Sequence, residues 1–358
     1  MNDVRILPPA HAERAAAEAA LDAQGIALPL MYRAAAAGAY RIEAPDLLVV
    51  CSADGLPAAV LALVSRAAAG MPGHRTMYVP YLGAAVPEQL ESRTLDALVA
   101  HVRRDARVLR LTAGIFTPDT AKADRLRAAL TLRQFRVAPL QNAYTRTLRL
   151  GLGPDIEQVL AGLHSSARRN IRELSKRPVV LEPITDPALS ERMEELTRET
   201  MLRTGGEFRP RDWRPVIELS QALPHRSRLV GIRRTDTAGP DALIGFSWGC
   251  HHGDHAVYAD SASVRPTDIR IAVAYPLLWD LIAWAKATGA RWFDLGGVTL
   301  GGATDGDPLG GISDFKRFFS EDLITVGEEW QMAPHTLRAA AAQAVHRWRT
   351  RGEAGGGP

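Results

Sequence analysis

Apolar and polar residues alternate with two different periods along this chain, and the clearest pattern lies between residues 275 and 319. Apolar positions recur at helical spacing over 275–287, and a glycine follows them. The next run, residues 291–296, is short, aromatic and bounded by glycines, which predicts a buried strand. A glycine-rich loop over 296–311 then leads into an amphipathic stretch at 314–319. The segment therefore predicts a helix, a strand, a loop and a second helix, in that order.

The rest of the chain predicts two successive sets of elements in a similar order. The first set is helices, a β-meander opened by a hairpin at Ala-Asp-Gly, and then alternating helices and strands. Its predicted helices are 10–23, 29–40, 88–104 and 119–130, and its strands are 46–52, 56–65, 76–81, 107–113 and 142–150. The second set begins after Gly-Leu-Gly-Pro, with helices at 156–163, 165–176, 187–203 and 213–222 and strands at 228–233, 242–250 and 255–263.

This repeated order predicts an α/β fold with mixed sheets and two tandem domains separated by a cleft. The expected domains are residues 1–150 and 151–335, with a C-terminal helix and a disordered tail over 336–358. A length of 358 residues, 46% of them hydrophobic, is ample for two cores.

Composition narrows the class of protein further. The net charge of +3 is mildly basic, so a polyanionic partner requires a local basic patch. Cys51 and Cys250 are too few for a disulfide framework, which favours a reducing, cytoplasmic compartment. Neither a signal peptide nor an apolar stretch long enough to span a bilayer is evident, so no membrane insertion is expected. The sequence does not predict an oligomeric state.

One succession of residues carries a family resemblance. It runs from Tyr275 through Leu278-Trp279, Trp284-Ala285 and Gly289 to Phe293-Asp294-Leu295-Gly296-Gly297, and then to Gly311-Ile312, Phe315-Lys316 and Phe318. This succession resembles the second half of the FemAB/FemX-like aminoacyltransferases, a branch of the acetyltransferase-fold superfamily that includes BioF2-like acetyltransferase domains. The resemblance implies tandem duplicated GNAT-like domains, with acyl transfer on the second and the acceptor on the first.

The resemblance also implies a reaction and a set of catalytic residues. Family members transfer an aminoacyl group, usually from an aminoacyl-tRNA, onto an amine, and their matching Phe-Lys pair lies near the transferred acyl group. Phe315 and Lys316 are therefore the expected catalytic pair, with the ammonium stabilising an oxyanion. Asp294 is a third catalytic candidate, as a general base or as a ligand of the amine. Its carboxylate can equally cap the turn that follows it, and we favour that structural role slightly.

A basic stripe is the main candidate for substrate binding. Arg168, Arg172 and Lys176 lie at positions i, i+4 and i+8 of a predicted helix, beside Arg169. Such a stripe can hold phosphates, or it can be a solvated helix face. The Arg-Arg element is similar to one that opens the second domain of FemX-like transferases, which favours contact with RNA or acceptor phosphates. Tyr258 and Tyr275 are also expected to contact substrate.

Other patterns argue against competing chemistries. His251, His252 and His255 have no further ligand in a suitable pattern, so no metal is expected. The glycine-rich loop is not followed by Gly-Lys-Ser or Gly-Lys-Thr, which argues against a nucleotide-triphosphate loop. Acetyltransferases bind coenzyme A through a glycine-containing turn, whereas the corresponding residues 265–272 contain no glycine. No cofactor is therefore expected beyond an acylated co-substrate.

Three functional hypotheses remain open on the sequence. The first is an aminoacyl-tRNA-dependent transferase that forms an amide on a small or peptide-like amine, either a secondary metabolite, as in antibiotic biosynthesis, or a peptidoglycan precursor. The second is an N-acyltransferase that uses a coenzyme A thioester. The third is a binding module on the same fold without catalytic activity.

Overall fold

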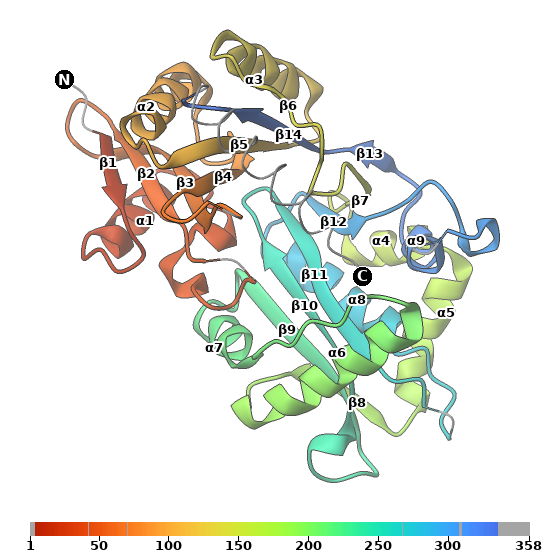
Figure 1. The fold of residues 1–358 in the computed structure, drawn as a ribbon. Coiled ribbons are helices and arrows are strands. Elements are labelled where there is room, and N and C mark those ends of the chain that lie inside the picture. The colour runs from red at the N-terminus through yellow and green to blue at the C-terminus, as the bar shows by residue number, and fades with distance from the viewer. Residues whose placement is uncertain (1–3, 42, 70, 267, 308–309, 336–358) are drawn as a thin grey trace, which may run out of the picture. The chain divides into compact units, whose positions relative to one another are not determined.

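The computed structural model describes residues 4–41, 43–69, 71–266, 268–307 and 310–335, which form two compact units (Figure 1). Unit 1 contains the described residues of 4–34, 43–145 and 326–335, and unit 2 contains 35–41 and the described residues of 146–325. Each unit is built on a seven-stranded mixed sheet. The predicted C-terminal helix and tail lie outside the described residues.

The sheet of unit 1 has the strand order β1-β2-β3-β4-β5-β14-β6. Its strands are β1 (Val4–Leu7), β2 (Asp46–Cys51), β3 (Pro57–Ala67), β4 (Arg75–Leu82), β5 (Val108–Phe116), β6 (Arg136–Val137) and β14 (Gly327–Met332). The helices of the unit are α1 (Arg14–Ala23), α2 (Glu91–Arg104) and α3 (Thr120–Leu132). β4 and β5 are parallel and α2 connects them, as a crossover between parallel strands requires, whereas the other neighbours are antiparallel.

The sheet of unit 2 has the order β13-β7-β12-β11-β10-β9-β8. Its strands are β7 (Arg146–Gly151), β8 (Val179–Pro183), β9 (Ser227–Arg234), β10 (Leu243–His251), β11 (His255–Ser263), β12 (Trp292–Gly297) and β13 (Leu323–Thr325). Its helices are α4 (Ile156–Gly162), α5 (Ser165–Glu173), α6 (Ser190–Thr204), α7 (Arg214–Ala222), α8 (Ala274–Ala287) and α9 (Gly310–Arg317). The parallel pair of this sheet is β11 and β12, which α8 connects.

Helices cover both faces of the second sheet. A Cβ at Gly249 of β10 would lie 3.1 Å from Leu281 of α8, so this position faces α8. Phe246, three residues earlier on the same strand, packs edge-on against Trp213 at the start of α7. Since neighbouring side chains of a strand point to opposite faces, α8 and α7 lie on opposite sides of the sheet.

The two sheets correspond strand for strand, and they exchange one strand. β14, which follows β13 in the chain, pairs between β5 and β6 of unit 1. β7, which follows β6, pairs in turn between β12 and β13 of unit 2. The predicted duplication of element order is thus confirmed as a duplicated sheet topology. The predicted boundaries near residues 150 and 335 did not include this exchange.

One predicted helix is wrong. Residues 29–40 form two short 3₁₀ turns, Leu30–Tyr32 and Ala34–Ala36, although the segment is rich in alanine. The buried guanidinium of Arg14 donates a hydrogen bond to the Tyr32 carbonyl oxygen at 2.7 Å, and the Tyr32 hydroxyl donates one to the Pro80 carbonyl oxygen. These tertiary contacts override the local propensity for a helix. Over the part of the chain described above, no helix is both long enough and apolar enough to cross a membrane.

Candidate active site

A buried carboxylate, that of Asp294, binds the backbone near the end of β12. Asp294 is 0% exposed, and its Oδ1 accepts hydrogen bonds from the Thr147 hydroxyl and, at 2.7 Å, from the Gly296 backbone N–H. Gly296 has a φ of +77°, a conformation that side chains other than glycine rarely adopt. The carboxylate thus caps the backbone at an irregularity near the end of β12, the Gly296 turn, where the pairing with β7 shifts register between Asp294 and Gly297. This is the structural role that the sequence slightly favoured.

Lys316 of α9 reaches the same turn. Its side chain is 6% exposed, and its Nζ donates to the Gly297 carbonyl oxygen at 2.8 Å. A Cβ at Gly296 would lie 3.3 Å from this Nζ, so any side chain there would press against the ammonium. Burial lowers the pKa of Lys316 to about 8, an effect that the charge of Asp294 partly opposes. A cation with few hydrogen-bond partners therefore lies at the end of a central strand.

Tyr258 of β11 borders the same glycine from the other side. Its carbonyl oxygen would lie 3.5 Å from a Cβ at Gly296. Burial raises the pKa of its phenol to about 12, while hydrogen bonds to Ser261 and Ser247 oppose the rise. Those two hydroxyl groups are 2.8 Å apart. The backbone carbonyl of the predicted substrate residue Tyr258 and the ammonium of the predicted catalytic residue Lys316 thus both border Gly296.

Aromatic side chains pack beside Lys316 along α9. The ring centroid of Tyr275 lies 5.0 Å from that of Phe315, edge to face, and 5.8 Å from that of Phe319. Phe318 lies 6.1 Å from Tyr275 in the same cluster. Burial raises the pKa of Tyr275, and the nearby charge of Arg169 opposes that rise. The structure therefore packs Tyr275 of α8 against Phe315 of α9, with Arg169 of α5 close enough for its charge to act on the Tyr275 phenol.

The predicted basic stripe divides into two pairs of residues. Arg168 donates to the carbonyl oxygens of Ala161, at 3.0 Å, and Leu163, so it joins the end of α4 to the start of α5. Lys176 pairs with Glu173 at 2.9 Å. Arg169 and Arg172 have exposed side chains on α5. Arg168 thus serves local structure, Lys176 is exposed but paired with Glu173, and Arg169 and Arg172 are exposed.

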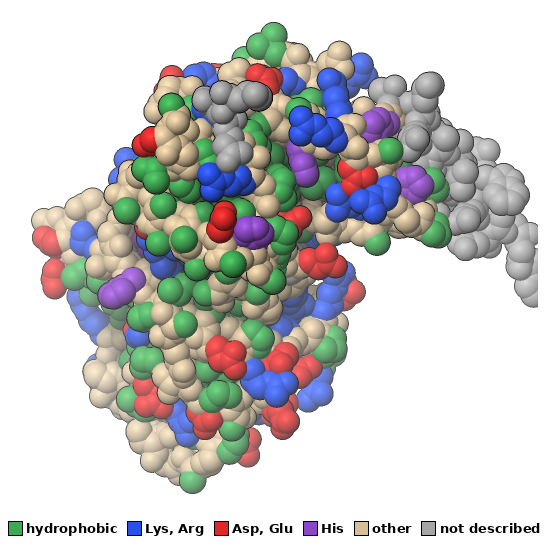
Figure 2. Space-filling model, turned by 90° about the vertical axis from the view of Figure 1, so that its left-hand side faces the viewer, with side chains coloured by type: hydrophobic (Ala, Val, Ile, Leu, Met, Phe, Trp, Pro, Cys, Tyr) green, Lys and Arg blue, Asp and Glu red, His purple; other side chains and the backbone are tan. Residues whose placement is uncertain are grey.

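Charge elsewhere on the surface is mixed. On the face drawn in Figure 2, basic and acidic side chains are interspersed, with apolar side chains between them. That face therefore presents no broad area of one sign. Any attraction for a polyanion in the coloured part of this view would come from single side chains and not from a continuous field.

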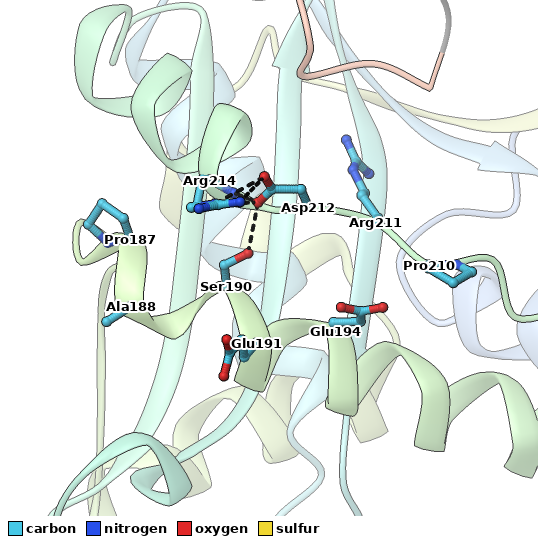
Figure 3. A pocket seen from close by; sticks show the side chains of 9 residues that line it. All are labelled: Pro187, Ala188, Ser190, Glu191, Glu194, Pro210, Arg211, Asp212 and Arg214. Carbon is cyan, nitrogen blue, oxygen red and sulfur yellow. Dashed lines mark hydrogen bonds and ion pairs between the residues drawn. The ribbon is translucent and has the colours of Figure 1, made fainter.

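Two hollows lie among the described residues of unit 2, and Lys316 lines neither of them. One, of about 620 Å³, lies between the start of α6 and residues 210–214. Figure 3 shows Arg214 bound to Asp212, which also accepts from Ser190, with the carboxylates of Glu191 and Glu194 along the helix. The other, of about 630 Å³, lies against the end of α9 and is bordered by Phe318 and Phe319 of the aromatic cluster.

Sequence reasoning missed the partners that shape the Gly296 turn. Thr147 comes from β7, 147 residues before Asp294 in the chain, and no local spacing links the two. The Gly297 carbonyl is a backbone group, which a search for reactive side chains does not consider. A threonine in an alternating strand beside the predicted domain boundary was the only available signal.

Comparison with known proteins places this geometry in a family context. The sequence pattern of the family described as Acetyltransferase (GNAT) domain matches residues 162–317. No curated protein matches the sequence significantly. Among solved structures, FemX matches with a TM-score of 0.70 and 13% identity over 92% of this chain and 97% of its own. L-PGS from Bacillus licheniformis matches with a TM-score of 0.55 and 9% identity over 92% of this chain and 96% of its own.

These matches bear on the resemblance drawn from the Tyr275–Phe318 succession. The likeness to FemX extends over nearly the whole of both chains, so it confirms the tandem GNAT-like fold. The matched residues 162–317 include Asp294 and end one residue after Lys316. Residues 162–317 thus match the acetyltransferase (GNAT) domain, in a chain whose fold is similar to that of FemX over 92% of its length.

Proposed function

We propose that this protein is an aminoacyltransferase that uses aminoacyl-tRNA as donor and forms an amide on an amine acceptor. The observation that carries the proposal is the buried ammonium of Lys316, held at the end of β12 by the Gly297 carbonyl. A desolvated cation is a strong hydrogen-bond donor to a developing oxyanion, because little water competes for the charge. The fold shared with FemX supports the same class of reaction.

The reaction needs no covalent intermediate on the protein. The acceptor nitrogen attacks the ester carbonyl carbon of the aminoacyl group, and a C–N bond forms as the carbonyl oxygen becomes an oxyanion. The Lys316 ammonium donates a hydrogen bond to that oxygen. The C–O ester bond then breaks, the ribose oxygen of the tRNA leaves and takes a proton, and the nitrogen loses one. Because an ester is already activated, positioning and oxyanion stabilisation supply most of the rate.

The acceptor is an amine on a secondary metabolite or on a peptidoglycan precursor. Tyr258 borders the Gly296 turn at which it reacts, and Tyr275 packs on the aromatic side chains next to Lys316 in the sequence. On α5, the exposed Arg169 and Arg172 are the members of the basic stripe available to phosphates of the tRNA or the acceptor. Arg169 supports this role better, because its charge already acts on Tyr275.

A second candidate is an acyl-CoA-dependent N-acyltransferase, which the GNAT domain match favours. Acetyltransferases bind the coenzyme A pyrophosphate with backbone N–H groups of a glycine turn at a helix start. Here the connection from β11 to α8 contains no glycine over 265–272, and its Ile269 and Ile271 pack partly into the core. These features weaken the coenzyme A hypothesis and support a different acyl carrier.

The donor is tested with the purified protein, a mixture of aminoacyl-tRNAs carrying labelled amino acids, and a panel of amines. We expect label to pass into an amide with the amine, and RNase treatment of the charged tRNA to abolish transfer. Acetyl-CoA added in place of the tRNA should support no transfer. Full transfer after RNase treatment, together with dependence on an acyl-CoA, would contradict the proposal that aminoacyl-tRNA is the donor and would favour the second candidate.

A further inference from the structure

Lys316 is one of several residues of α9 that hold the segment after β12. The next residue, Arg317, donates from its guanidinium to three consecutive carbonyl oxygens of the glycine-rich loop. The distances are 2.9 Å to Thr299, 3.3 Å to Leu300 and 3.4 Å to Gly301. A planar fork of five N–H donors suits several acceptors at once, whereas a lysine ammonium offers a single point charge.

Two further side chains of α9 complete this contact. Ser313 is 1% exposed, and its Oγ accepts from the Thr299 backbone N–H at 3.0 Å and lies 3.0 Å from the Thr299 hydroxyl. Asp314 binds the Arg317 guanidinium at 2.7 Å and so orients it. A Cβ at Gly302 would lie 3.1 Å from the Asp314 carboxylate, which shows how closely the loop approaches the helix.

These contacts hold the chain two residues after the carbonyl group that binds the Lys316 ammonium. Gly297, whose carbonyl receives that ammonium, is two residues before Thr299. The loop is rich in glycine, so its backbone has a high conformational entropy when nothing restrains it. A loop held at Thr299 keeps the Gly297 carbonyl in place and excludes water from Lys316.

We propose that Arg317 and Ser313 are positioning residues, which clamp residues 299–301 onto α9 and thereby hold the Lys316 ammonium against the end of β12. Neither side chain needs to touch the substrate for this role. The effect on turnover rests on the proposed function, but the effect on the environment of Lys316 does not, because it is a property of the protein alone.

The test compares Arg317→Met and Ser313→Ala with the wild type. Lys316 is labelled with a trace of acetic anhydride over a range of pH, and mass spectrometry of its peptide gives the rate and the apparent pKa. Asp294 is the charged group that acts on Lys316, and it is unchanged in both variants. Arg228→Met is the matched control, because it breaks a two-bond ion pair with Asp280 in the same unit without touching α9.

In the wild type we expect Lys316 to titrate at about 8 and to label slowly. In Arg317→Met the pKa should rise by about one unit or more toward its normal value, because water enters. The limiting rate of labelling at high pH, where the amine is neutral, should become severalfold faster because the reagent reaches it more easily. Ser313→Ala should show a smaller change in the same direction, and Arg228→Met none. If Arg317→Met does not fold, Arg317→Lys keeps the charge but loses the fork, and the same shift is expected.

An unchanged labelling rate and pKa in a folded Arg317 variant would overturn the clamp. With the labelled aminoacyl-tRNA assay, the clamp further predicts a kcat about tenfold lower with little change in KM, since a small misplacement of a catalytic group costs rate more than binding. A labelling shift in a protein that transfers nothing from aminoacyl-tRNA would support the clamp and count against the proposed function. The two failures are therefore distinguishable.

Discussion

The parallel strand pairs of the two units differ in how far they stay together. In unit 1, β4 and β5 pair from Arg75 and Val108 to Leu82 and Ile115, with register shifts after Arg75 and between Val79 and Leu82. In unit 2, β11 and β12 pair over three residues only, ending at Val257 and Asp294. The two sheets have the same strand order, so the difference lies in local interactions and not in the topology.

Different residues occupy the corresponding region of each pair. Beyond the last paired residues of unit 2, the turn at Gly296 is bordered by Lys316 and by the carbonyl of Tyr258. In unit 1, Gly114 of β5 is covered by the hydroxyl of Tyr78, which would lie 2.8 Å from a Cβ there. The helix after β5, α3, buries alanine and leucine side chains and no lysine.

This difference teaches where the chemistry of a duplicated fold arises. One unit keeps its central strands joined and fills the region with an aromatic side chain. In the other unit, β11 and β12 part after Val257 and Asp294, while β12 stays paired with β7 as far as Gly297. Asp294 caps the backbone at this opening, and Lys316 places a cation there. We therefore expect changes at the opening in unit 2 to affect catalysis, and matched changes in unit 1 to affect stability alone.

The largest effect should come from removing an exchanged strand. A chain ending at Thr325 lacks β14, whose Trp330 and Met332 are buried in the core of unit 1. Loss of two such side chains and a strand should cost more than about 5 kcal/mol, enough to unfold unit 1. The reference is a chain ending at His335, which lacks residues 336–358 but keeps β14. Equal circular dichroism and equal urea midpoints of the two chains would show that β14 is dispensable.

The next largest effect should come from Lys316→Met. Removing one donor to an oxyanion typically lowers kcat by about 10²- to 10³-fold, and we expect a loss of that size with little loss of stability. The control is Lys122→Met, on the helix that follows the central strand of unit 1, which should leave kcat unchanged. If the Lys316 variant turned over as fast as the wild type, Lys316 would have no role in the mechanism. The proposed difference in catalytic role between the two units would then fail.

A smaller effect should come from adding one methyl group to each parallel pair. Gly296→Ala places a Cβ at positive φ and 3.3 Å from the Lys316 ammonium, so it should displace the cation and lower kcat roughly tenfold. Gly114→Ala meets the Tyr78 hydroxyl and should cost about 1–3 kcal/mol of stability with no change in kcat. Steady-state kinetics and urea unfolding of both variants measure the contrast. A Gly114 variant that loses more turnover than the Gly296 variant would reverse it.

Much of the fold could be predicted from the sequence, because the residue patterns that specify many of its helices and strands are local. The Ala-Asp-Gly hairpin is β2 and β3, and the periodic run at 275–287 is α8 almost residue for residue. Strands whose pairing depends on distant residues were not predicted: β1, β8, β13 and β14 are short, and their partners lie far away in the chain. β7 and β14 occupy the same position in two sheets of the same strand order. No local sequence pattern specifies which of the two sheets each strand joins.

The candidate site follows the same division. Lys316 and Asp294 were predicted from a resemblance, and their roles stay predictions, but their meeting at Gly296 required the structure. The stripe of Arg168, Arg172 and Lys176 shows the opposite problem. Helical spacing placed these residues on one face, yet the Arg168 guanidinium bends back onto the carbonyls of Ala161 and Leu163. Spacing gives the direction of a Cβ, and it does not tell which partner a long side chain takes.

The pH dependence of kcat for the wild type and for Lys316→Arg tests most directly whether the Lys316 ammonium takes part in catalysis. If the ammonium of Lys316 stabilises an oxyanion, wild-type kcat should fall above about pH 8, where the pKa of this lysine lies. A guanidinium stays protonated, so the ratio of variant to wild-type kcat should rise about tenfold per pH unit above that point. A ratio that does not depend on pH would contradict the central claim, because the protonation of Lys316 would then not matter for the rate.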